Sequence, residues 1–196
     1  MKKHYFLIAV IAALCVLSNE EVFAQKDSCF LEISGGVGLE TSSNFSFGAA
    51  FIGGFNVTNK MFLGAIVGYE YFDSLYMSTK YNVKEDYGYV YQPKNLLQFG
   101  LRVKRKFSTN LTSPFIGLDC GMNKQISNTE YACADGFFIK PTIGLDIDLG
   151  GGLIMYMAVA YKSQNNSYNV FDIPHGLSEE RETRSELVNF SIGFQF

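Results

Sequence analysis

Glu186-Leu-Val-Asn-Phe-Ser-Ile-Gly-Phe-Gln-Phe196 is the stretch of sequence that decides the fold. From Val188 on, every second residue is apolar and the residues between are small or polar; the apolar set is Val188, Phe190, Ile192, Phe194 and Phe196. A period of two is that of a β-strand, whose side chains alternate between two faces. A strand with one face this apolar is typical of a barrel wall that meets lipid.

The same alternation recurs along the chain in eight segments. They are 29–40, 45–57, 61–72, 96–107, 114–123, 137–149, 153–162 and 186–196. Each is long enough to cross the hydrocarbon core of a bilayer as a tilted strand. We therefore predict an all-β fold, an eight-stranded antiparallel up-and-down transmembrane β-barrel.

The face opposite the apolar one carries charges of both signs with glycines between them. The charged residues are Glu32, Glu70, Arg102, Lys104, Asp119, Lys140, Asp146, Asp148 and Lys162. The interior of an eight-stranded barrel is just wide enough for side chains to fill. The sequence thus predicts a plugged polar core. Arg105 is the one charge on the apolar face, near a predicted strand end where its stem can reach the headgroups.

The connections between the segments differ in length. The second, fourth and sixth, near 58–60, 108–113 and 150–152, are short, and the third, fifth and seventh, near 73–95, 124–136 and 163–185, are long. The first, near 41–44, is short too. Short turns on the periplasmic side and long loops outside are typical of outer-membrane barrels. Pro141 interrupts the sixth segment, since it lacks a ladder donor, and we expect a bulge or a later strand start there.

A soluble β-sandwich or lipocalin-like barrel is the alternative fold, because alternation alone does not say which face is inside. The apolar set would then form the core and the glycines would face water. Strands favour threonine or lysine over glycine at water-facing positions, so the membrane barrel is the better interpretation.

The amino terminus has the form of an export signal. Lys2 and Lys3 precede an apolar run from Tyr5 to Leu17, and a cleavage point is expected before Gln25. We predict a signal peptide at 1–24 and one barrel domain at 25–196. No run of about 18 apolar residues follows, so no transmembrane helix is expected. The net charge of −3 argues against a nucleic-acid partner.

Together, the signal, the eight segments and the closing Val188-x-Phe190-x-Ile192-x-Phe194-x-Phe196 resemble the small OmpA/OmpX-type outer-membrane barrels. The resemblance implies the outer membrane of a Gram-negative bacterium, with membrane lipid and lipopolysaccharide as neighbours. It also implies that the insertion machinery reads the closing strand. Proteins of this type include envelope structural proteins, adhesins, immune-evasion factors and a few lipid A-modifying enzymes, and a shared fold does not choose among these roles.

Tyrosines gather in the connection 73–95, namely Tyr76, Tyr81, Tyr87, Tyr89 and Tyr91. The last three keep the strand period, so we predict a hairpin that continues the third and fourth segments and turns near Lys84-Glu85-Asp86. Tyrosine offers a large contact area with a polar tip and suits recognition of an extracellular protein or glycan. Alternatively, these tyrosines pack the hairpin or lie among lipopolysaccharide headgroups.

The connection 163–185 gathers His175, Ser178 and Glu179, which could act as base, nucleophile and orienting carboxylate of a lipid A hydrolase. A solvated loop is the better interpretation of this charge-rich stretch. Of the cysteines, Cys120 and Cys133 could pair in the oxidising envelope, or Cys29, Cys120 and Cys133 could remain free thiols. We expect no metal and no cofactor, because the histidines and carboxylates lack ligand spacing.

The leading hypothesis is a non-enzymatic outer-membrane barrel whose plugged body displays external loops for binding, adhesion or envelope integrity. The alternatives are a lipid A-modifying enzyme, a small solute pore and an accessory barrel of a secretion apparatus. An enzyme would alter lipid A mass, and a pore would conduct ions.

Overall fold

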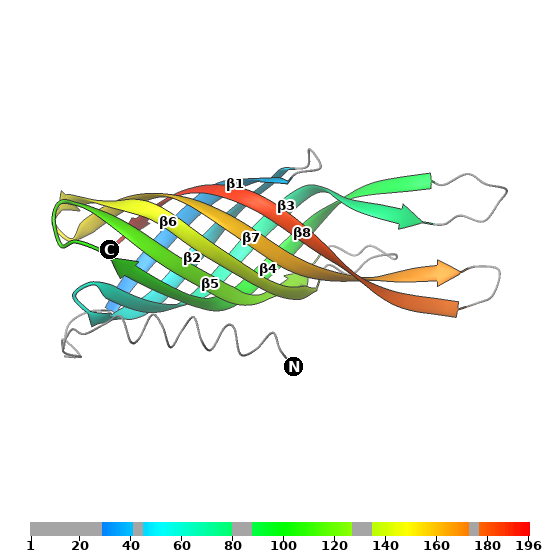
Figure 1. The fold of residues 1–196 in the computed structure, drawn as a ribbon, viewed down its shortest axis with the longest axis horizontal. Helices are drawn as coiled ribbons and strands as arrows, with labels where there is room; N and C mark the ends of the chain where they lie inside the picture. Colours follow the sequence, from blue (N-terminus) through cyan, green and yellow to red (C-terminus); the bar gives the residue numbers. More distant parts are fainter. Residues whose placement is uncertain (1–28, 41–44, 80–87, 127–134, 173–176) are drawn as a thin grey trace.

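The protein forms a closed antiparallel barrel of eight strands in a computed structural model, which describes residues 29–40, 45–79, 88–126, 135–172 and 177–196 (Figure 1). Each strand pairs with the next along the chain, and β8 returns to pair with β1. The strands are β1 (Cys29–Glu40), β2 (Phe45–Thr58), β3 (Met61–Thr79), β4 (Gly88–Lys106), β5 (Thr112–Gln125), β6 (Gly136–Gly150), β7 (Leu153–Asp172) and β8 (Leu177–Gln195). The predicted fold class is confirmed.

The end of the chain closes the barrel. The backbone N–H of Leu31 donates to the carbonyl of Phe196 at 3.1 Å, and that of Phe196 donates back to Leu31 at 2.8 Å. The alternating apolar residues of β8 face outward, and Ile192 is 54% exposed. The inward residues of the same strand are buried, among them Leu187 and Gln195. The closing stretch therefore has the two faces that its sequence predicted.

Large apolar side chains cover the outer wall of the whole barrel, whereas charged side chains are buried inside. Phe51 is 56% exposed and Ile143 is 64% exposed, while Glu32 and Lys162 are each 1% exposed. A soluble barrel has the reverse arrangement, so the alternative of a sandwich or lipocalin-like fold is wrong. An apolar wall around a polar interior is the arrangement that a bilayer stabilises.

Short turns join the strands at one end, which we call the turn end. In the β2–β3 turn, Thr58 Oγ1 accepts hydrogen bonds from the backbone N–H groups of Lys60 and Met61, at 3.2 and 3.0 Å. In the β6–β7 turn, Gly150, Gly151 and Gly152 have φ values of 85°, 65° and 86°, a left-handed conformation that favours glycine. The short connections predicted at 58–60 and 150–152 are thus tight turns, stabilised by residues within the turns themselves.

At the opposite end, two pairs of strands run beyond the rest of the barrel as two-stranded ribbons (Figure 1). Pairing of β3 with β2 ends at Phe72, but β3 and β4 stay paired as far as Thr79 and Gly88. This outer part is the β3–β4 ribbon, and it confirms the predicted hairpin. The predicted turn at Lys84-Glu85-Asp86 lies outside the described residues.

The second ribbon was not predicted. β7 and β8 stay paired from Asn165 with Arg184 to Asp172 with Leu177, where a long loop at 163–185 was expected. This outer part is the β7–β8 ribbon. Its residues 165–169 are polar at successive positions and the apolar Val170 and Phe171 are adjacent, so the apolar alternation that marked the membrane strands is missing. The predicted loop was wrong for that reason.

Pro141 is accommodated in a way that the sequence did not predict. β6 begins at Gly136 and passes straight through Pro141, which keeps its pairing with Leu118 of β5. On the other side the β6–β7 pairing skips Lys140 and Pro141 and resumes at Thr142 in the same register. The missing N–H therefore opens a local gap between two strands, without a bulge or a later strand start. Among the described residues, no helix is long and apolar enough to cross a membrane.

Candidate functional site

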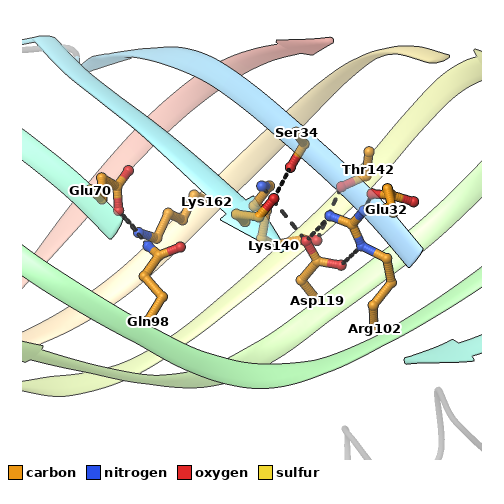
Figure 2. Close-up of polar contacts among 10 residues, drawn as sticks. Glu32, Ser34, Glu70, Gln98, Arg102, Asp119, Lys140, Thr142 and Lys162 are labelled. Atoms are coloured by element: carbon orange, nitrogen blue, oxygen red, sulfur yellow. Dashed lines mark hydrogen bonds and ion pairs between the residues drawn. The ribbon is translucent and has the colours of Figure 1, made fainter. Parts of the chain in front are cut away.

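Charged side chains meet at the centre of the lumen in what we call the central cluster, formed by Glu32, Arg102, Asp119 and Lys140 (Figure 2). The β4–β5 register sets Arg102 opposite Asp119, and the guanidinium donates to both carboxylate oxygens, at 2.7 and 2.8 Å. Arg102 also donates across the lumen to Glu32 of β1. Lys140 of β6 adds a longer ion pair to Asp119, at 3.6 Å. A two-pronged guanidinium contact of this kind fixes geometry as well as charge.

Nearer the ribbon end, Glu70 of β3 is the acceptor of a second cluster, which we call the upper cluster. Its carboxylate accepts hydrogen bonds from Gln98 at 2.5 Å and from Lys162 of β7 (Figure 2). It also accepts one from Ser46 at 3.2 Å. The Lys162 ammonium also lies over aromatic rings, and the apolar side chains packed here are Phe72, Leu96, Phe138 and Leu187. Every oxygen of this buried carboxylate thus has a donor.

Nearer the turn end, Asp146 of β6 is the acceptor of a third cluster, the lower cluster. It pairs with Lys104 at 2.6 Å and with Lys106 at 3.0 Å, both from β4. The Lys104 ammonium lies 4.3 Å from the centre of the Phe115 ring, a cation–π distance. Other buried rings and aliphatic side chains complete this layer, namely Phe30, Ile52, Phe62, Ile66 and Tyr156. Side chains fill the described lumen at three successive levels.

The predicted inward charges lie in the lumen, with one exception. Asp148 is exposed at the turn end, where its carboxylate accepts a hydrogen bond from the N–H of Gly150 at 2.8 Å. The carboxylate caps the turn, so its predicted place in the core was wrong. Two inward lysines were missed, Lys94, which is buried, and Lys106, which pairs with Asp146. Both keep the period of two that Arg102 and Lys104 follow on β4, and that signal could have found them.

Three of the predicted recognition tyrosines fall on one face of the β3–β4 ribbon. Tyr76 pairs directly with Tyr91, and Ser78 pairs with Tyr89. A register shift between Phe72 and Leu75, opposite Pro93, brings Tyr76 into phase with the two tyrosines of β4. Tyr81 and Tyr87 lie outside the described residues.

The other predicted site residues are not brought together by the described part of the chain. Ser178 and Glu179 occupy successive positions of β8 in the β7–β8 ribbon, so they fall on opposite faces, and His175 lies outside the described residues. Cys29 and Cys120 form no disulfide with each other or with any other described residue. Cys133 lies outside the described residues, and the Cys120–Cys133 disulfide stays a prediction. Within the described segments, no group of three or more histidine, cysteine or carboxylate side chains could hold a metal ion.

Comparisons with known proteins place the fold. No family model and no curated protein matches the sequence. The crystal structure of Neisserial surface protein A matches with a TM-score of 0.52 and 10% identity, covering 85% of this chain and 94% of that one. The solid-state NMR structure of the outer-membrane protein AlkL in lipid bilayers matches with a TM-score of 0.55 and 12% identity, covering 91% and 95%.

The outer-membrane enzyme PagL is also similar, with a TM-score of 0.48 and 15% identity over 84% of this chain and 98% of that one. At such identities the likeness is one of fold. The predicted resemblance to small eight-stranded outer-membrane barrels is confirmed at that level. With its apolar outer wall, the chain has the architecture of a bacterial outer-membrane protein.

Proposed function

We propose that the protein is a non-enzymatic barrel of the outer membrane whose plugged body holds two ribbons outside the cell for binding. In this proposal the mature chain is 25–196, after removal of a signal peptide at 1–24. The observation that carries it is the projection of both ribbons from the end opposite the short turns (Figure 1). With the short turns in the periplasm, both ribbons lie outside.

The body of the barrel suits the role of a rigid base. The central and upper clusters join strands across the lumen, as Arg102 of β4 does with Glu32 of β1, and the lower cluster joins β4 to β6. Paired strands also hold the ribbons in one extended geometry before any ligand arrives. Such preorganisation reduces the entropy lost on binding.

The β3–β4 ribbon supplies the proposed binding face, made of Tyr76, Tyr89 and Tyr91; Tyr81 and Tyr87, outside the described residues, stay candidates for the same ligand. The ligand in this proposal is an extracellular protein or glycan, because aromatic rings with a polar tip contact both. The opposite face of the ribbon carries Leu75, Met77 and Val90 by register. The two faces therefore offer a matched comparison.

Binding of the purified barrel, embedded in nanodiscs, to a glycan array and to immobilised extracellular matrix proteins tests the proposal. Replacing Tyr76, Tyr89 and Tyr91 by serine should remove the binding seen with the unaltered barrel. Replacing Met77 and Val90 by serine changes the other face and should leave it intact. Equal loss in both variants, or no binding by the unaltered barrel, would contradict the tyrosine face.

Iodination of intact cells gives a second readout of the same surface. Tyr89 and Tyr91 should be modified from outside if they form a binding face. Full protection of both would place them against the protein's own loops or among lipopolysaccharide headgroups, and the recognition role would be abandoned.

The proposal assigns no reaction to His175, Ser178 and Glu179. Mass spectrometry of lipid A from cells with and without the gene should give the same spectrum. A loss of deacylated lipid A in the deletion strain, repeated by Ser178→Ala, would replace the binding role by a hydrolytic one.

A further inference from the structure

A cavity of about 50 Å³ lies in the lumen between the central and upper clusters. Small residues of β1, β2 and β8 leave this space, and polar side chains from several strands border it. The polar residues are Ser34, Glu70, Gln98, Lys140, Asn189 and Ser191. Figure 2 shows Lys140 between the Glu70–Lys162 pair and the Arg102–Asp119 pair. A space of this size holds more than one water-sized body.

The lining offers hydrogen-bond donors with spare capacity. Asn189 is 9% exposed, and its side-chain nitrogen has no hydrogen-bond partner among the described residues. Lys140 reaches Asp119 at 3.6 Å, whereas Arg102 holds the same carboxylate at 2.7 and 2.8 Å. A buried donor without an acceptor destabilises the folded protein. An acceptor in the cavity would remove that destabilisation.

The charges around the cavity favour an acceptor that is itself an anion. Within the described lumen, the three clusters contain more cations than carboxylates: Arg102, Lys104, Lys106, Lys140 and Lys162 face Glu32, Glu70, Asp119 and Asp146. Lys140 has the longest ion pair of this set. Glu70 borders the cavity, but its carboxylate already accepts from Ser46, Gln98 and Lys162. Lys140 is therefore the cluster lysine whose charge is least closely paired with a carboxylate.

We propose that this cavity is a binding site for a small monovalent anion of the halide class, held by the Lys140 ammonium and the Asn189 amide, with the hydroxyls of Ser34 and Ser191 beside it. The anion neutralises the most loosely paired lysine of the core and satisfies the free Asn189 N–H. The stability of the plugged barrel then depends on the concentration of this anion in solution. The proposal is independent of what the ribbons bind.

Crystals of the unaltered protein soaked in sodium bromide test the site directly, because bromide scatters anomalously. We expect an anomalous peak in the cavity that is absent from Lys140→Met crystals. A cavity that holds only water, or a peak that persists without the ammonium, would overturn the proposal.

Unfolding in detergent micelles gives a second test at constant ionic strength, with chloride exchanged for gluconate, which is too large for the cavity. Chloride at ten times its Kd should raise the ratio of folded to unfolded protein about tenfold. Asn189→Asp places a carboxylate where the anion binds, so this variant should lose the chloride effect and remain folded. Lys106→Met removes a lysine of the lower cluster and should keep the effect. Equal unfolding in the two salts for the unaltered protein would contradict an anion site.

Discussion

At the scale of single residues, the Glu70–Lys162 pair shows how this core resolves buried charge. The two residues come from β3 and β7, on opposite sides of the lumen, and Ser46 and Gln98 satisfy the remaining lone pairs of the carboxylate. Removing two charges from water is costly, and their attraction offsets that cost when the hydrogen bonds are complete. The pair is therefore more sensitive to the loss of one partner than to the loss of both.

Single and double substitutions at this pair measure that sensitivity. Glu70→Gln or Lys162→Met alone should lower the free energy of unfolding by about 3–5 kcal/mol, because each leaves one buried charge uncompensated. The double variant should recover much of that loss. Urea unfolding of the barrel in lipid vesicles gives the free energy of unfolding of the unaltered protein and of the three variants. If the double variant loses as much stability as the two single variants together, the two residues are not coupled.

Which residues point inward followed from sequence, but their partners did not. The period of two assigned Glu32, Arg102 and Asp119 to one face of their strands. Contact between Glu32 and Arg102 depends on how strands stagger around a closed barrel, and a local pattern along one strand carries no such information. The cavity beside Lys140 was unreadable for the same reason, since its walls come from strands on both sides of the lumen.

At the scale of elements, glycine pairs let neighbouring strands approach closely inside the barrel. Gly54 of β2 pairs with Gly64 of β3, and a Cβ on Gly54 would collide with the carbonyl oxygen of Leu63 and the Cα of Gly64. Gly53 lies on the outer face, and a Cβ there would meet nothing within 4 Å. Adjacent glycines in one strand thus have different structural demands.

Alanine at these two positions separates close approach from chain entropy. Gly54→Ala should destabilise the barrel by about 1–3 kcal/mol, since the strands must move apart. Gly53→Ala should stabilise it by about 0.4–1 kcal/mol, because alanine restricts the unfolded chain and fits the open site. The midpoint of urea unfolding, followed by the heat-modifiable mobility of the folded barrel on gels, measures the change in stability of each variant. If Gly53→Ala lowers the stability of the barrel as much as Gly54→Ala does, the backbone freedom of glycine, and not the collision of the added Cβ, would account for the loss.

The length of the outer strands shows where pattern-based prediction stops. Inside a bilayer one face of each strand must be apolar, so the alternation is strong and all eight crossings were found. Beyond the bilayer both faces can be polar, and Asn165 to Asp172 pair with β8 without any alternation. The β3–β4 ribbon was predictable because Tyr87, Tyr89 and Tyr91 carry the period on past the membrane.

At the scale of the whole molecule, the barrel is a filled body with an apolar wall and two projecting ribbons. Charged clusters occupy three levels of the described lumen. Phe72, Leu96 and Leu187 pack together at the upper cluster, on the ribbon side of the cavity beside Lys140. A channel needs a continuous polar path, and in this account the filled lumen does not provide one.

Recordings from planar bilayers test the filled lumen. The unaltered barrel should insert without steps of ionic current at 100 mV, a voltage that applies about 2.3 kcal/mol per elementary charge. Refolded protein scored for heat-modified migration confirms that the inserted material is folded. Reproducible steps of one size would favour the small solute pore and contradict the plugged body.

Trypsin treatment of intact cells tests the central claim most directly, that the barrel spans the outer membrane with both ribbons outside. Arg181 and Arg184 belong to the β7–β8 ribbon, and Lys80 and Lys84 fall in the sequence between β3 and β4, whereas Lys60 and Arg105 lie at the turn end. Mass spectrometry of the released peptides should show cuts confined to the first group, with Lys60 cut only after the outer membrane is broken. Protection of both groups until the membrane is broken, with the protein then found free in the periplasm, would contradict a transmembrane barrel.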